Sequence, residues 1–106
     1  MPPARLPRLG LGTLAILQAI EQGRAFGFDI MDVTGLTSGT VYPALDRLED
    51  LGLVTSRWES DAVARREARP ARRYFVITRE GTRALEAARD RYPAFRGAPA
   101  PARRYP

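Results

Sequence analysis

The segment from Thr37 to Gly52 constrains the fold more than any other part of the chain, because its pattern is that of a helix with one apolar face. Apolar residues at positions i, i+3, i+4 and i+7 form a single stripe on a helix. Here they are Val41, Ala44, Leu45 and Leu48. Thr37 or Ser38 can cap the start of this helix, and Gly52 can end it. The sequence therefore predicts a surface helix with one buried and one exposed face.

The exposed face of this helix carries hydroxyls, charges and a proline. Its residues are Thr40, Tyr42, Pro43, Asp46, Arg47 and Asp50. Inside a helix, Pro43 removes a backbone hydrogen bond and crowds the preceding turn. We therefore expect a bend at Pro43 or an irregular first turn. An unfavourable residue on an exposed face is typical of a functional site.

The segments on either side predict three more helices and a hairpin. Helices are expected over residues 12–22, ending at Gly23, over 28–33, and over 79–92, where Thr78 caps the start. Strands are expected over 53–59 and 73–78, joined by a long hairpin connection, 60–72. Trp58 lies on the first strand, and we expect it to pack in the core or on the strand rather than to serve as a ligand platform.

Composition excludes several classes of function. A chain of 106 residues is long enough for one small domain, and 44% hydrophobic with 27% charged residues is ordinary for a globular protein. The chain has no Cys and no His, so it has no disulfide, no thiol nucleophile and none of the commonest metal ligands. We expect no catalytic residue, no metal and no cofactor. Asp29 and Asp32, three residues apart, are expected to lie on a solvated helix face.

No stretch of the sequence approaches the ~18 apolar residues that a membrane span needs. Gln18 and Glu21 fall where a secretory signal would have its apolar core and cleavage site. We therefore expect a cytoplasmic protein that has no membrane partner.

Positive charge is concentrated in a few places. All 17 cationic residues are Arg, and residues 65–73 hold five of them with one Glu. Residues 1–8 and 93–106 also carry Arg and no acid, whereas 9–92 has equal numbers of Arg and acids. This distribution is typical of a protein that binds a polyanion. The alternative is that these arginines are merely solvated.

Two helices predict a second subunit. The expected first helix is apolar around most of its circumference, and the last has a narrow stripe that nothing later in the chain could cover. We expect a homodimer interface that includes Leu14, Leu17, Leu85, Ala88 and Tyr92. The first helix could equally be a central core helix.

Three helices, a two-stranded hairpin with a basic tip and a last helix follow the order of a winged helix-turn-helix domain. The stretches SGTVYPALDRLE (38–49), GLV (52–54) and RRYFVITREG (72–81) resemble the PadR family of bacterial transcriptional regulators. The resemblance covers about residues 12–90. It also accounts for Pro43, since the family carries a Tyr-Pro at this point of its recognition helix.

These elements predict a mainly α fold with a small β-hairpin (α+β), made of a winged helix-turn-helix domain, 9–78, and a C-terminal dimerisation helix, 79–92. The Pro-broken start and the Pro/Ala-rich end of the chain predict a flexible arm, 1–8, and a disordered tail, 93–106. The resemblance implies a homodimer, usually a repressor, that binds a pseudo-palindromic operator in double-stranded DNA. The DNA-binding residues would be Thr37, Ser38, Gly39, Thr40, Tyr42, Pro43 and Arg47 on the helix, with Arg65, Arg66, Arg69, Arg72 and Arg73 on the wing.

Two features depart from the family pattern. The wing is rich in Ala and Arg, without the Gly-rich tip common in the family, and the C-terminal region is one short helix. A pocket for a small-molecule effector would therefore lie at the dimer interface, or the protein has none. The main alternative function is a winged-helix protein-interaction module that does not bind DNA. The third helix favours this alternative, because Asp46, Glu49 and Asp50 outweigh Arg47, whereas the basic wing favours DNA.

Overall fold

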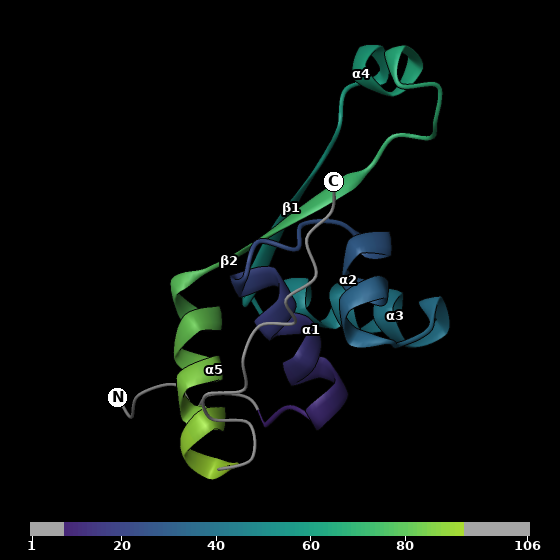
Figure 1. Ribbon diagram of the computed structural model, residues 1–106. Helices are drawn as coiled ribbons and strands as arrows, with labels where there is room; N and C mark the ends of the chain where they lie inside the picture. Colours follow the sequence, from purple (N-terminus) through teal and green to yellow (C-terminus); the bar gives the residue numbers. More distant parts are fainter. Residues whose placement is uncertain (1–7, 93–106) are drawn as a thin grey trace.

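A computed structural model of the protein describes residues 8–92. The expected flexible arm (apart from Arg8) and the expected disordered tail lie outside the described residues. Five helices and one two-stranded antiparallel sheet make up the described part (Figure 1). In chain order they are α1 Leu11–Glu21, α2 Gly27–Thr34, α3 Ser38–Asp50, β1 Val54–Trp58, α4 Asp61–Arg66, β2 Arg73–Ile77 and α5 Arg79–Arg91. The mainly helical winged-helix fold predicted from the sequence is confirmed.

Helix α1 is the central element of the core. It packs against α2, α3, α5 and β2. Five of its residues, which are Leu14, Ile16, Leu17, Ala19 and Ile20, are buried within the single chain. Its broad apolar surface is thus explained by contacts inside the subunit, as the core-helix interpretation held.

The stripe on α5 is also covered within the chain. Leu85 and Ala88 have no exposed surface, and they belong to the same buried cluster as Leu14 and Leu17 of α1. The expectation that these residues lack intramolecular cover is wrong. Small residues along the α5 stripe allow the helix to lie close against α1. Only Tyr92, at the end of α5, is half-buried and packs at the edge of the core.

Helix α3 has the buried face that its sequence predicts. Val41, Leu45 and Leu48 are buried. Gly52 takes a positive φ of 74° after the helix, while its N–H bonds to Glu49 O and the N–H of Leu53 bonds to Leu48 O. These two bonds form a Schellman motif, which turns the chain directly into β1.

Pro43 does not interrupt α3, which runs continuously from Ser38 to Asp50. The regular i→i+4 bond of the first turn is present, and an i→i+3 bond accompanies it. The carbonyl of Thr37 accepts from the N–H of Thr40 at 3.0 Å and from that of Val41 at 2.9 Å. The link to Thr40, which spans three residues, is a 3₁₀-type bond of the kind that is frequent at helix termini.

The wing is a hairpin that projects away from the helices (Figure 1). Val54 pairs with Ile77 at its base, and Trp58 pairs with Arg73 at its outer end. The long connection 60–72 contains the short helix α4 at the wing tip, which the sequence pattern did not predict. The hydroxyl of Ser60 caps α4 by accepting from the N–H of Val63 at 3.2 Å.

The start of α5 is fixed to the end of α3 by close backbone packing. The Thr78 hydroxyl accepts from Gly81 N–H at 3.1 Å and donates to Gly52 O at 2.7 Å. A side-chain carbon at Gly81 would collide with the carbonyl of Leu53 and would lie 2.7 Å from Ile77 Cγ1. Within residues 8–92, no helix combines the length and the apolar character needed to cross a membrane.

Candidate nucleic-acid interface

The N-terminal half of α3 and its cap present an exposed polar surface. All seven residues expected to read DNA from this helix are exposed: Thr37, Ser38, Gly39, Thr40, Tyr42, Pro43 and Arg47. None of the described acidic side chains lies in the first turn of α3. Free backbone N–H groups at a helix start favour anions such as phosphates. This end of α3 is therefore suited to lie against a nucleic acid.

Tyr42 combines exposure with packing. Its side chain is 45% exposed, and its ring lies against the backbone of Gly27, the first residue of α2. It also lines a groove together with residues of the wing. Tyr42, which the sequence predicts to contact DNA, thus has one packed side and one open side.

The expected wing arginines fall into two groups. Arg65 and Arg66, in the last turn of α4, are exposed. Among the described residues, neither has an ion-pair partner within bonding distance. Arg69, Arg72 and Arg73 are half-buried and interact within the subunit. The wing tip thus leaves two cations available to an external anion.

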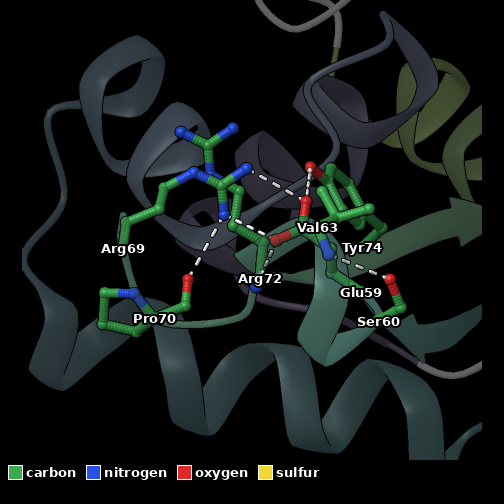
Figure 2. Close-up of polar contacts among 7 residues, drawn as sticks. All are labelled: Glu59, Ser60, Val63, Arg69, Pro70, Arg72 and Tyr74. Atoms are coloured by element: carbon green, nitrogen blue, oxygen red, sulfur yellow. Dashed lines mark hydrogen bonds and ion pairs between the residues drawn. The ribbon is translucent and has the colours of Figure 1, made fainter. Parts of the chain in front are cut away.

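Arg69 is held by Glu59 in a two-pronged ion pair. Its two terminal nitrogens donate to the two carboxylate oxygens at 2.6 and 3.0 Å (Figure 2). The Tyr74 hydroxyl and the Arg72 backbone N–H also donate to Glu59, at 3.1 and 3.3 Å. Arg69 above all, then these two donors, lower the pKa of Glu59 from 4.5 to about 2 against the opposing effect of burial. The pKa of Arg69 is raised in turn. This cluster joins the two ends of the connection that carries α4, because Glu59 precedes α4 and Arg69 and Arg72 follow it.

Arg73 ties the wing to the C-terminal half of α3. It forms ion pairs with Glu49 and, at 3.5 Å, with Asp46. Its Nε donates to the Ser56 hydroxyl at 3.0 Å, and that hydroxyl donates to Glu49. Two of the three acids that weighed against DNA binding by α3 are therefore paired with a wing arginine. These contacts set the angle between wing and helix.

Trp58 does not lie in the core, which was one of the two places expected for it; it lies on the strand, opposite Arg73. Its side chain is 67% exposed at the outer end of β1. The guanidinium of Arg73 lies 6.0 Å from its ring centroid. Asp29 was expected on a solvated helix face, but its side chain is only 11% exposed and pairs with Arg24 at 3.4 Å, whereas Asp32 is exposed as expected.

Sequence reasoning missed two groups of residues around the wing. One is the set of acids and hydroxyls that hold the arginines, namely Glu49, Ser56, Glu59 and Tyr74. The other is a pair of phenylalanines, Phe26 and Phe28, of which Phe28 is 72% exposed. Phe26, Gly27 and Phe28 form a short apolar stretch in the sequence. The sequence alone does not show whether such a stretch is buried in the core or exposed beside the wing. No group of three or more potential metal-ligating side chains occurs in the described part of the chain.

Comparison with known proteins decides the family. The family model described as "Transcriptional regulator PadR-like family" matches residues 16–87. This is more than half of the chain. The protein belongs to the PadR-like family. The match spans most of α1, the whole wing and most of α5, so it includes every element of the candidate interface.

Solved structures of PadR-family regulators share this fold. One from Clostridium difficile R20291 is 24% identical with a TM-score of 0.69, covering 80% of this chain and 90% of its own. A PadR-like transcription factor from Bacteroides fragilis is 22% identical with a TM-score of 0.66, covering 77% and 80%. One from Eggerthella lenta DSM 2243 is 28% identical with a TM-score of 0.60, covering 78% and 74%. No curated protein matches the sequence. The family and these neighbours are transcriptional regulators rather than enzymes, consistent with the expected absence of catalysis.

Proposed function

We propose that this PadR-like regulator is a sequence-specific repressor that binds a pseudo-palindromic operator in double-stranded DNA as a homodimer. The observation that carries the proposal is the exposed polar half of α3 beside a wing whose tip presents Arg65 and Arg66. In this arrangement α3 enters the major groove and the wing tip reaches the flanking backbone. As a DNA-binding member of a family of bacterial regulators, it would act in the cytoplasm.

The two surfaces have different tasks in this proposal. Hydroxyls and the phenol of α3 can contact base edges, which carry sequence information. The guanidinium groups of Arg65 and Arg66 can pair with phosphate, which supplies affinity without specificity. Arg69 and Arg73, expected to contact DNA, are instead assigned to holding the wing in place, since acids of the same subunit already pair with them.

The dimer remains part of the proposal, with altered details. Four of the residues expected at the dimer interface instead hold α5 against α1 inside each subunit, and so support the dimer only indirectly. They are Leu14, Leu17, Leu85 and Ala88. The surface left for a second copy includes the half-buried Tyr92 at the end of α5 and Leu11, 59% exposed, at the start of α1. Two copies of α3 related by a two-fold axis would then meet two half-sites about one helical turn apart.

Selection of binding sites from random DNA with the purified protein tests this function. We expect a two-fold symmetric motif and a complex of two chains per duplex in sedimentation. If the dimer neutralises on the order of 6–10 phosphates, affinity should fall by roughly 10³–10⁵-fold between about 50 and 200 mM salt. Failure to enrich any motif, with no salt-dependent binding to random duplex, would favour the protein-interaction alternative.

A further inference from the structure

The tip of the wing carries a helix that is too short to be stable alone. Helix α4 has six residues, whereas isolated helices shorter than about 12–15 residues are marginal in water. It lies at the far end of the projecting wing (Figure 1). Ala64, its one buried residue, is not part of the hydrophobic core cluster. The order of α4 must therefore come from the chain segments directly on either side of it.

The end of α4 adopts a turn that is unfavourable for its sequence. Ala68 has a φ of 54°, and within residues 8–92 it is the one residue other than glycine with a positive φ. The N–H of Ala68 donates to Arg65 O at 3.1 Å. The N–H of Arg69 donates to Ala64 O at 3.2 Å. These two bonds form a Schellman motif, but a left-handed backbone disfavours alanine, so the turn needs support from outside itself.

Glu59 connects the chain before α4 to the chain after it. Its two carboxylate oxygens accept from the two terminal nitrogens of Arg69 at 2.6 and 3.0 Å, and one of them also accepts from the N–H of Arg72 at 3.3 Å (Figure 2). The N–H of Glu59 donates to Arg72 O at 2.8 Å. The side chain of Glu59 is 8% exposed, so salt screens this ion pair less than a pair on the open surface. The connection is therefore closed into a loop at its base, and α4 is fixed beyond that closure.

We propose that Glu59 is a positioning residue for DNA binding, which holds α4 in one orientation and thereby directs Arg65 and Arg66 toward phosphate. This step rests on the proposed function, because it requires that the wing tip contacts DNA. Both arginines are exposed in the last turn of α4, directly before the turn that Arg69 closes. A guanidinium group on a fixed helix loses less entropy on pairing with phosphate than one on a mobile loop. Glu59 thus strengthens DNA binding although its own charge repels phosphate.

The order of α4 is tested first, on the whole protein without DNA. The double variant Glu59→Gln/Arg69→Gln removes the ion pair and leaves the net charge unchanged. In ¹⁵N relaxation of the natural protein, the backbone amides of α4 should have order parameters of about 0.85, as in rigid backbone. In the double variant they should fall below about 0.6, with those of α1 unchanged. An α4 that stays rigid without the pair would overturn the proposal.

DNA affinity is tested next, because a purely structural role would not change it in a folded protein. The double variant should bind both the selected operator and random duplex at least about fivefold more weakly at the same salt concentration. The two losses should be alike, since phosphate contacts carry no sequence information. An unchanged or increased affinity would overturn the proposal.

Glu67→Gln is the control for charge on the same connection. Glu67 is exposed, and none of the ion pairs found in residues 8–92 involves it. Removing this acid should leave DNA affinity unchanged or raise it slightly, because one repulsion of phosphate is lost. A loss equal to that of the double variant would show that any change in the connection weakens binding, and would overturn the role of Glu59.

A double-mutant cycle shows whether Glu59 acts through the two exposed arginines. When Arg65 and Arg66 are already Ala, removing the Glu59–Arg69 pair should weaken DNA binding by no more than about twofold. Fully additive losses would overturn the proposed route. If the double variant fails to fold, Arg69→Lys decides, because it keeps the charge and loses the two-pronged geometry. It should loosen α4 and weaken DNA binding, and a rigid α4 with natural affinity would overturn the proposal.

The same measurements separate this proposal from the proposed function. If the natural protein binds no duplex, the proposed function fails and the DNA role of Glu59 fails with it. If the natural protein selects an operator and the variant without the pair binds it equally well, the proposed function stands and only the role of Glu59 is refuted.

Discussion

The ring of Tyr42 on α3 occupies the space that a side chain at Gly27 on α2 would need. An ideal Cβ at Gly27 would lie 2.7 Å from Tyr42 Cζ and 2.9 Å from Cε1. Any other residue at position 27 would therefore push the ring outward. This contact explains why Tyr42 is neither free nor buried: its direction is set by α2, and its outer side is left to the groove and to a partner.

Replacing Gly27 by Ala should move Tyr42 without unfolding the protein. The colliding atoms belong to the far end of a half-exposed side chain, which can rotate at small cost, and Ala favours the helix by up to about 1 kcal/mol relative to Gly. The melting temperature should therefore change little. Operator affinity should fall by more than affinity for random DNA, because a displaced phenol no longer makes a base contact worth about 1–3 kcal/mol.

The control for this prediction is a double-mutant cycle with Tyr42→Ala. If Gly27→Ala acts through the ring, it should have no effect on operator affinity once Tyr42 is already Ala. Tyr42→Ala alone should lower the ratio of operator to random-DNA affinity and keep the melting temperature close to that of the natural protein. A large fall in melting temperature with an unchanged ratio would assign Tyr42 to packing instead.

Gly81 should tolerate substitution far less well than Gly27. A methyl group there would meet the backbone carbonyl of Leu53, which cannot rotate away, and Ile77 Cγ1 at 2.7 Å. Gly81→Ala should destabilise the fold by about 1–3 kcal/mol, measured by urea unfolding. Gly12→Ala is the matched control, because its nearest neighbour would be Leu36 Cδ1 at 3.9 Å. It should be neutral or stabilising, and equal losses in both variants would contradict this account.

The ion pair at Glu59 predicts sensitivity to acid. Its pKa is lowered from 4.5 to about 2 in the folded protein, chiefly by Arg69. A carboxylate with a lowered pKa stabilises the fold above its unfolded pKa, and this contribution disappears as the pH falls from about 4.5 to about 2. Carbon-detected NMR titration should give Glu59 the lowered value, and Arg69→Gln should return it toward 4.5. A normal pKa in the natural protein would mean that the pair does not form in solution.

Much of the fold follows from local sequence patterns. The apolar stripe of α3, its end at Gly52 and the two β-branched strands depend on neighbours within a few residues. They were predicted to within one or two positions of the observed bounds. The exposed half of α3 was predictable for the same reason, since a single buried stripe determines which side chains are left outside.

Contacts between distant segments were not predictable in this way. The pairing of Arg73 with Glu49, 24 residues apart, depends on the angle between wing and helix. The burial of Leu85 depends on how closely α5 can approach α1, which the spacing along each helix does not reveal. Helix α4 has only six residues, too few to show a periodic pattern. These are the points at which the predicted site and interface needed correction.

Leu85 should be essential for folding rather than for dimerisation. Its side chain has no exposed surface in a single chain and packs between α5 and α1. Leu85→Ala should cost about 2–5 kcal/mol of stability. Chemical unfolding at two protein concentrations measures this, and Leu85→Asp should leave no cooperative transition. A folded, monomeric Leu85→Asp variant would instead place this residue at the surface between subunits.

The wing tip and the wing base should differ in what they do for DNA binding. Arg65 and Arg66 are exposed, whereas Arg69 is held by Glu59. Replacing both Arg65 and Arg66 by Ala should weaken operator and random DNA alike and flatten the slope of log affinity against log salt by about 0.9 for each phosphate that is no longer neutralised. Arg69→Ala should leave that slope nearly unchanged, because its charge is already neutralised, and should lower thermal stability instead. Binding isotherms at several salt concentrations, with melts of each variant, measure both effects. An unchanged slope in the double variant would show that Arg65 and Arg66 are only solvated, and a slope lowered by Arg69→Ala would show that the pair with Glu59 opens on DNA.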